Sequence, residues 1–206
     1  LLEGIKCDAV ELNFNTCKRH TLELAEILKA YFSKKGYDKN KIVGSFDWDP
    51  MEKIVMQGHD VEGLLDIAPK LVAAMKEYPK FRTIAVNAVS LNNSGAYIVQ
   101  ELGYALAWGN EYLNQLVDAG VDADTAANNI KFNLGISENF FMEMSKFRAA
   151  RMLWAEIVKQ YGPKDDKSCM MCVNAVTSKY NMTLFDSYVN LLRSQTEAMS
   201  AALAGV

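Results

Sequence analysis

The chain has 206 residues, of which 50% are hydrophobic, 10% aromatic and 23% charged, and this composition is typical of a packed domain and excludes a disordered or fibrous protein. Its 22 Lys and Arg residues nearly balance 25 Asp and Glu residues, and no basic block interleaved with aromatic residues occurs, so nucleic acid is not an expected partner. No apolar run reaches the roughly 20 residues that span a bilayer, and the first residues lack signal-peptide features, so we expect no membrane partner and a cytoplasmic location.

Five short apolar runs, each followed by a stretch with helical periodicity, occur along the chain. The runs cover residues 5–14, 41–46, 82–89, 130–136 and 167–176, and the helical stretches begin near Lys18, Val61, Gly95, Glu138 and Leu184. Near-continuous apolar strands that alternate with helices are typical of a parallel sheet buried on both faces. The sequence therefore predicts an α/β fold of five β/α units. Because no Pro-, Gly- or Ser-rich linker interrupts them, we expect residues 1–206 to form a single domain.

Three features predict where helices begin and end. Asp49 followed by Pro50 fits an N-cap and first helical position, and Ser137 is the expected N-cap of a helix that ends at Gly162-Pro163. That helix carries an apolar stripe expected to pack on the sheet: Phe140, Met144, Phe147, Ala150, Trp154 and Val158. The acidic stretch at residues 118–128 lacks the spacing of a calcium loop and is interpreted as a helix connection.

Neither the cysteines nor the histidines complete a catalytic or metal-binding motif. Cys169 and Cys172 lie three apart in a predicted strand, where their side chains would point to opposite faces, and no second cysteine pair or histidine cluster accompanies them. We expect buried structural thiols. His20 at the head of one helix and His59 ahead of another are expected to be surface or capping residues, so a histidine general acid is not indicated.

The ends of the predicted strands, where β/α folds bind ligands, carry mostly neutral side chains. They are Asn15, Asp47, Ser90, Asn133 and Thr177. Asp47 and Asp49 could bind a cation or share acid and base roles, but no third acidic residue follows a neighbouring strand. The alternative is an N-cap role for Asp49 and a solvated Asp47. This edge of the sheet can form hydrogen bonds, but it offers little acid–base chemistry.

The stretch NFFMEMSKFRAARMLWAEIVKQYGPK at residues 139–164 resembles the adenosylcobalamin-dependent acyl-CoA mutases, the methylmalonyl-CoA mutase family. The similarity extends through SLNNSGAYIVQELGYALAWGNEYL before it and TLFDSYVNLLRSQTEAMSAALAG after it, and more loosely through residues 42–57. It implies a substrate-binding (β/α)8 TIM barrel with acyl-CoA along its axis and cobalamin held by a separate domain. About five of the eight units fit in this chain, which would make it an internal fragment of such a barrel.

The resemblance also implies an altered active site. The family's Tyr-His pair falls at Val89 and Ser90, and its other substrate-binding positions fall at Ser45, Asp47, Gln57, Asn129, Cys172 and Asn174. Loss of the family's arginine would remove a charge-assisted contact to the substrate carboxylate, worth about 1.5 to 3 kcal/mol. Loss of its histidine would remove the hydrogen bond to the thioester carbonyl. These mostly neutral residues, with Asp47 as a departure, resemble the pattern of the non-catalytic small subunit of heterodimeric family members.

That resemblance implies a large catalytic subunit as partner, adenosylcobalamin bound in the complete heterodimer, and no cofactor bound by this chain. Two alternatives are an acyl-CoA mutase with altered substrate specificity and a stand-alone β/α lyase that uses Asp47 with a metal ion. An open parallel sheet of five strands also leaves unpaired edges, so we expect the isolated chain to form a homodimer.

Overall fold

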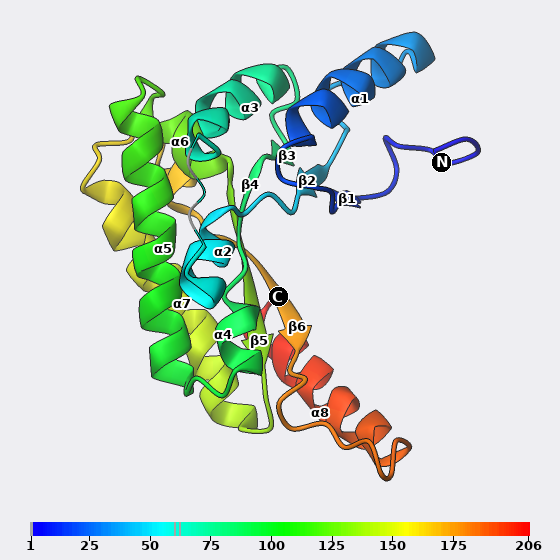
Figure 1. Ribbon diagram of the computed structural model, residues 1–206, viewed down its shortest axis with the longest axis vertical. Coiled ribbons are helices and arrows are strands. Elements are labelled where there is room, and N and C mark those ends of the chain that lie inside the picture. The colour runs from blue at the N-terminus through cyan, green and yellow to red at the C-terminus, as the bar shows by residue number, and fades with distance from the viewer. Residues whose placement is uncertain (1, 60, 62) are drawn as a thin grey trace.

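In the computed structural model, which describes residues 2–59, 61 and 63–206, short parallel strands form two sheets (Figure 1). The first sheet has the order β1-β2-β3 and the second has the order β4-β5-β6. The strands are β1 (Leu12–Phe14), β2 (Gly44–Phe46), β3 (Phe81–Arg82), β4 (Ile84–Val86), β5 (Ile130–Ile136) and β6 (Cys172–Thr177). All the strand pairs of both sheets are parallel. The predicted α/β class with parallel strands is confirmed.

The two sheets join at Thr83, which separates β3 from β4. The amides of Thr83 and Ile84 both donate to the carbonyl oxygen of Asn129, at 3.1 and 3.0 Å, an arrangement in which one residue of the strand is extra, as in a β-bulge. Just beyond, the Ala85 amide donates to the Trp48 carbonyl at 3.0 Å. The sheets therefore continue into one another, and residues 81–86 act as a single interrupted strand between β2 and β5.

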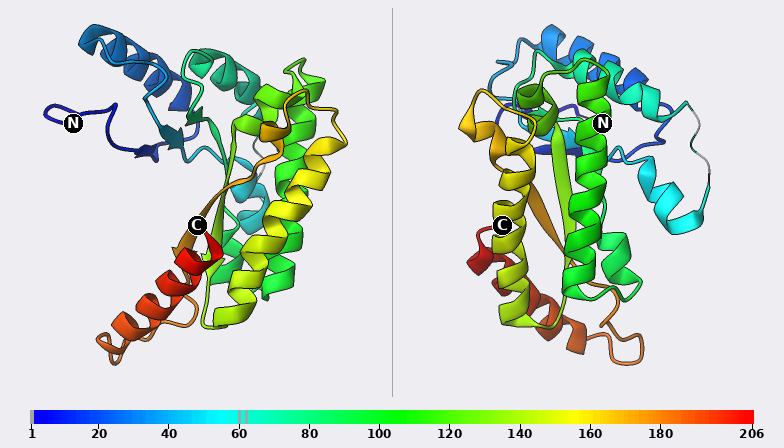
Figure 2. Two further views of the ribbon diagram at one scale, coloured as in Figure 1. Left: turned by 180° about the vertical axis from the view of Figure 1, so that it is seen from behind. Right: turned by 90° about the vertical axis from the view of Figure 1, so that its left-hand side faces the viewer.

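Helices cover one side of this layer. They are α1 (Thr21–Lys35), α2 (Met51–Gln57), α3 (Ala68–Met75), α4 (Val89–Asn93), α5 (Ile98–Asp118), α6 (Ala123–Asn128), α7 (Phe140–Lys159) and α8 (Val189–Ala204), with 3-10 turns at Leu65–Ile67 and Asp166–Cys169. α5 and α7 lie side by side along β5, and α8 packs against α7 (Figure 2). Among the described residues, none of the helices is long and apolar enough to cross a bilayer.

The core between β5 and its helices explains why the stripe on α7 is apolar. Phe147, Ala150, Trp154 and Val158 are buried, and the Trp154 ring meets Phe132 of β5 at a centroid distance of 4.8 Å. Gly109 of α5 faces the same ring, since a Cβ there would lie 2.4 Å from Phe132 Cζ. Glycine at this position lets α5 approach the sheet closely.

Several predicted element bounds are wrong. Residues 5–11 are turns and loop, and only Leu12–Phe14 forms a strand. Val89 begins α4, so the third apolar run leaves the strand after Val86. Cys169 lies in a 3-10 turn ahead of β6. Apolar content alone does not distinguish a strand from a turn or loop: Cys169 is buried within a 3-10 turn, whereas Ile5 and Val10 of the first run are exposed in turns and loop.

The predicted helix ends also need correction. α2 begins at Met51 with Pro50 in the N-cap position, and α7 begins at Phe140 with Asn139 as its N-cap. The interpreted connection at residues 118–128 contains α6, whose N-cap Asp122 accepts a 3.0 Å bond from the Thr125 amide. The sequence signals therefore place the helices, but they shift the caps by one or two residues.

Candidate functional site

The face of the sheets opposite α5 and α7, called the inner face from here on, carries polar side chains. Asn13, Ser45 and Arg82 are register partners on β1, β2 and β3, as are Lys131 with Cys172 and Asn133 with Asn174 on β5 and β6. Register partners on parallel strands point to the same face. The intervening residues Phe46, Phe132 and Leu134 are buried in the core on the other face.

Lys131 joins the strands on the inner face, further from their carboxyl ends than Asn133. Its ammonium donates to Ser45 Oγ at 2.7 Å and to Asn13 Oδ1 at 3.4 Å, while the Ser45 hydroxyl donates to Asn13 Oδ1 at 2.5 Å. Lys131 is only 5% exposed. Burial lowers its pKa, with the nearby charge of Asp47 opposing that shift.

A second group of bonds joins the carboxyl ends of the strands. Asn133 Nδ2 donates to Asp47 Oδ1 at 3.2 Å and to Asn87 Oδ1 at 2.6 Å. Asn15 Nδ2 donates to the other Asp47 oxygen at 3.1 Å, and the Lys18 ammonium donates to the Asp47 backbone carbonyl. Both oxygens of Asp47 are therefore engaged by amides, in contrast to the solvated Asp47 expected from sequence.

The structure brings together three of the strand-end residues proposed from sequence, namely Asn15, Asp47 and Asn133. Ser90 instead lies in α4, where its hydroxyl donates to Glu52 Oε1 at 2.5 Å, and Thr177 is an exposed end of β6. Sequence reasoning missed Asn87 and Lys131. The signal for Lys131 was the alternation Ile-Lys-Phe-Asn at residues 130–133, which is typical of a strand with one polar face.

The positions that the mutase resemblance marks as altered do not form one constellation. Ser45, Asp47, Cys172 and Asn174 share the inner face. Gln57 is the exposed last residue of α2. The others are held elsewhere: Val89 and Ser90 open α4, and Asn129 caps α6, donating to the Thr125 carbonyl at 2.9 Å and accepting the Thr83 hydroxyl at 2.9 Å.

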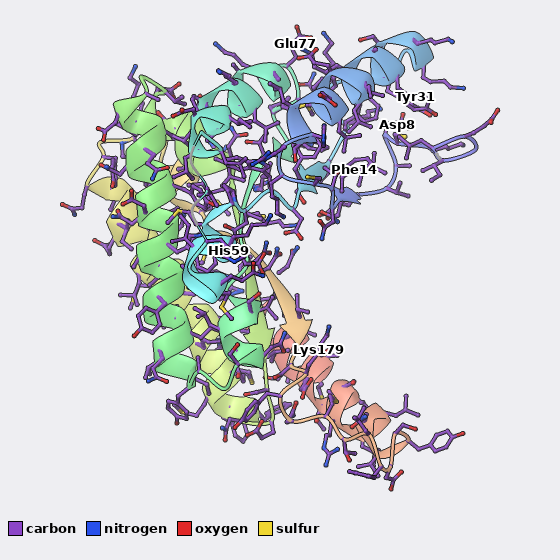
Figure 3. All side chains as sticks on the ribbon, viewed as in Figure 1. Asp8, Phe14, Tyr31, His59, Glu77 and Lys179 are labelled. Carbon is purple, nitrogen blue, oxygen red and sulfur yellow. The ribbon has the colours of Figure 1, made fainter. Side chains whose placement is uncertain are left out.

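The cysteines and histidines add no reactive group to this face beyond the Cys172 thiol. Cys169 is buried, Cys172 is half-buried, and burial raises the pKa of both thiols. His20 is exposed, with Nδ1 3.1 Å from Glu23 Oε2, and His59 is exposed beside α2 (Figure 3). Within the described ranges, no group of three His, Cys, Asp or Glu side chains could hold a metal ion.

Asp49 is fully buried and connects β2 to α5 and β4. Its Oδ2 accepts the Asn87 amide at 2.7 Å, and its Oδ1 accepts the Tyr112 hydroxyl at 2.7 Å and Trp108 Nε1 at 3.2 Å. The Glu52 amide donates to Oδ1 at 3.3 Å, which retains part of the expected capping role. Burial raises the pKa of Asp49 to about 7, and the donated bonds oppose that shift.

A second buried polar group lies between β5, α5 and α7. The Lys146 ammonium contacts Glu101 Oε2 at 2.7 Å, Glu143 Oε2 at 2.6 Å and the Gly135 carbonyl at 2.7 Å. Glu101 also accepts the Gly135 amide at 2.5 Å, and Glu143 accepts the Ser137 hydroxyl at 2.6 Å. All three ionic side chains are buried. The group ties two helices to the strand and is closed to substrate.

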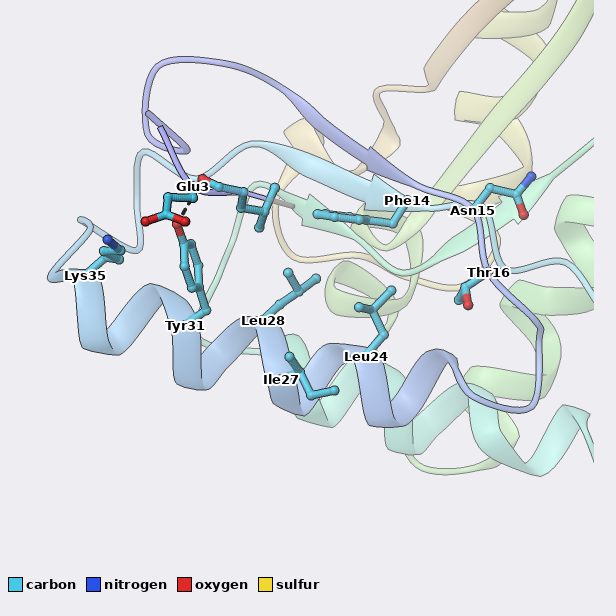
Figure 4. Close-up of a pocket in the computed structure, with 10 residues that line it drawn as sticks. Glu3, Phe14, Asn15, Thr16, Leu24, Ile27, Leu28, Tyr31 and Lys35 are labelled. Carbon is cyan, nitrogen blue, oxygen red and sulfur yellow. Dashed lines mark hydrogen bonds between the residues drawn. The ribbon is translucent and has the colours of Figure 1, made fainter. Parts of the chain in front are cut away.

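An apolar cavity of about 590 Å³ lies between the N-terminal segment and α1 (Figure 4). Leu2, Phe14, Leu24 and Leu28 line it, and the Tyr31 hydroxyl donates to the Leu2 carbonyl at 3.0 Å across one end. Its lining is mainly hydrocarbon and offers no arrangement of nucleophile and base.

Fold and site together define a parallel β/α protein with a polar inner face, on which Lys131 is hydrogen-bonded to Asn13 and Ser45, and Asn133 to Asp47. A family model described as methylmalonyl-CoA mutase matches residues 1–206, and the chain belongs to that family.

Its relatives include both subunits of a bacterial enzyme. The methylmalonyl-CoA mutase small subunit of Porphyromonas gingivalis is 48% identical over 207 residues, which cover 100% of this chain and 34% of that relative. The large subunit from the same organism is 38% identical over 143 residues, covering 67% of this chain and 20% of the relative. The human mitochondrial methylmalonyl-CoA mutase is 33% identical over 178 residues, which cover 84% of this chain and 24% of that relative. The chain thus spans about a third of the length of the small subunit that it matches.

Proposed function

We propose that the chain is part of the non-catalytic small subunit of a heterodimeric methylmalonyl-CoA mutase. In this proposal a large subunit isomerises methylmalonyl-CoA and succinyl-CoA, and this chain supplies a structural surface. The greater identity to the small subunit, 48% against 38% for the large subunit of the same organism, supports the assignment.

The observation that carries the proposal is the hydrogen bonding among polar side chains of the inner face. An anionic acyl group needs an available cation, and the Lys131 ammonium already donates to Ser45 and Asn13, whereas Arg82, the register partner of Ser45, takes part in none of these bonds. Asp47 adds a negative charge at the carboxyl ends of the strands, where it accepts bonds from Asn15 and Asn133. A carboxylate at that place repels an anionic ligand.

The inner face lacks a histidine to take the role that the family resemblance gives to one, the hydrogen bond to the thioester carbonyl. Both histidines of the chain lie at exposed positions next to helix termini, and the position that the resemblance assigns to the family's histidine is Ser90, bonded to Glu52. Neither His20 nor His59 lies at the inner face, and the family resemblance places cobalamin on a separate domain, so we assign the cofactor to the complete heterodimer.

The proposal extends to the complete fold. Five parallel strand positions in sequential order, with helices on one side, support a partial (β/α)8 barrel as a single domain. The outer strands β1 and β6 present unpaired backbone groups. The homodimer expected for the isolated 206-residue chain would cover these edges, and light scattering that shows a monomer at high concentration would count against it. A cytoplasmic location belongs to the same proposal.

Mixing the purified protein with a large subunit tests the proposed partnership. We expect a one-to-one complex by size-exclusion chromatography with light scattering, with mutase activity that depends on the large subunit. An absence of complex formation would contradict the proposal. A metal titration that shows tight Mg²⁺ or Mn²⁺ binding, lost on Asp47→Asn, would favour the lyase alternative instead.

A further inference from the structure

Lys131 is an unusual residue to find on the inner face. Lysine is almost never fully buried unless it is paired, yet Lys131 is 5% exposed and is absent from the ion pairs of the described residues. Its partners are neutral oxygens contributed by two other strands, Ser45 Oγ and Asn13 Oδ1. A buried cation whose hydrogen bonds go only to neutral acceptors is costly to the fold, and the nearby Asp47 carboxylate offsets part of that cost.

The reach of this side chain is as unusual as its burial. β5 is separated from β2 by the interrupted strand β3–β4, so the ammonium passes over that strand to reach β2 and β1. Asn133, two residues further along β5, spans the same gap to Asp47. The two side chains therefore connect the second sheet, β4-β5-β6, to the first, β1-β2-β3, across the inner face.

We propose that Lys131 closes the inner face against ligands. The ammonium occupies the space that a bound anion or amide would need, and its bonds hold β5 against β1 and β2 without any ligand. This inference rests on the proposed non-catalytic role and adds a physical cause to it: the face is filled by its own side chain, in addition to lacking the groups for catalysis.

Cys172 provides a reporter for this closure. It is the register partner of Lys131 on β6 and is half-buried on the same face. Cys17 is exposed and Cys7 and Cys169 are buried away from the inner face, so the chain carries its own reference thiols. Because the nearby Lys131 charge favours the thiolate of Cys172, removal of that charge would by itself slow alkylation. An acceleration in a Lys131 variant therefore reports access.

The test is peptide-resolved alkylation of the purified full-length protein by N-ethylmaleimide. We expect Cys172 to react about tenfold slower than Cys17 in the parent protein, since thiolate exposure controls the rate. Lys131→Ala and Lys131→Met should each accelerate Cys172 about fivefold or more, because both lose the ammonium, while Lys131→Arg should restore slow labelling. Cys17 should not change in any variant.

Three results would overturn the inference. Equal Cys172 rates in the parent and both neutral variants would show that the ammonium does not close the face, and parallel acceleration of Cys7 and Cys169 would show general loosening of the fold. Coenzyme A is the ligand probe. At about 1 mM, which is the dissociation constant of a weak ligand, it should not protect Cys172 of the parent protein from alkylation. Protection would show that the face accepts a ligand. Failure of the proposed function would appear separately, as mutase turnover by the protein alone.

Discussion

Replacement of Lys146 by methionine tests the buried ionic group that fixes α5 and α7 to β5. The ammonium donates to Glu101 Oε2 and the Gly135 carbonyl and forms an ion pair with Glu143 Oε2 at 2.6 Å, and methionine fills similar volume without a charge. Breaking a buried ion pair from one side costs about 3 to 5 kcal/mol. Since domains are stable by only about 5 to 15 kcal/mol, we expect a large fall in the free energy of unfolding at pH 8.

The pH dependence separates this charge effect from lost packing. Burial already raises the pKa of Glu101, and Lys146 opposes that shift, so the variant should raise it further. A carboxyl whose folded-state pKa lies above its unfolded value stabilises fully at low pH and loses that contribution as pH rises. The defect of Lys146→Met should therefore be small near pH 4 and grow toward pH 8.

Urea denaturation followed by circular dichroism at several pH values measures the defect. Lys159→Met is the matched control, because its 2.7 Å pair with Glu156 lies on the exposed side of the same helix, and we expect no measurable change in its urea midpoint. A Lys146→Met defect that matches this control, or that stays constant with pH, would refute the charge-based reasoning.

Two further substitutions test the buried contacts of α5. Asp49→Asn should gain stability relative to the parent as pH rises from about 4 to 7, by up to about 4 kcal/mol. Burial raises the pKa of Asp49 from 3.8 to about 7, so only the parent bears the cost of ionising a buried carboxyl in this range. Parallel stability–pH curves from urea titrations of the two proteins would contradict this. Gly109→Ala should cost about 1 to 3 kcal/mol through overpacking, because its Cβ would meet the Phe132 ring at 2.4 Å. Gly103→Ala on the same helix, with no atom within 4 Å of the new Cβ, should stabilise by about 0.5 to 1 kcal/mol, and thermal melts that rank the two alike would refute the packing argument.

The parallel order of the strands followed from the sequence because strands and helices have different periods. The run at residues 130–136 coincides with β5, whose seven residues are all buried, and the flanking helices leave no competing interpretation. The extra residue at Thr83 could not be predicted, since it depends on Asn129 presenting one carbonyl to two amides. That contact joins residues distant in sequence.

Contacts between residues distant in sequence also explain which features of the candidate site could not be predicted. The sequence indicated a neutral set of strand ends, and the structure brings Asn15, Asp47 and Asn133 together. It gave no sign that Lys131 crosses to another sheet, because a lysine in an apolar run is usually solvated at its tip. Burial of Asp49 was likewise hidden, since its donors Tyr112 and Trp108 come from a helix about 60 residues away.

Mutase turnover by the purified protein alone, supplied with adenosylcobalamin and methylmalonyl-CoA, tests the non-catalytic assignment most directly. We expect no succinyl-CoA above background from the protein by itself, and activity once the large subunit is added. Sustained succinyl-CoA formation by the protein alone would show that its own inner face performs the reaction, and would contradict the account.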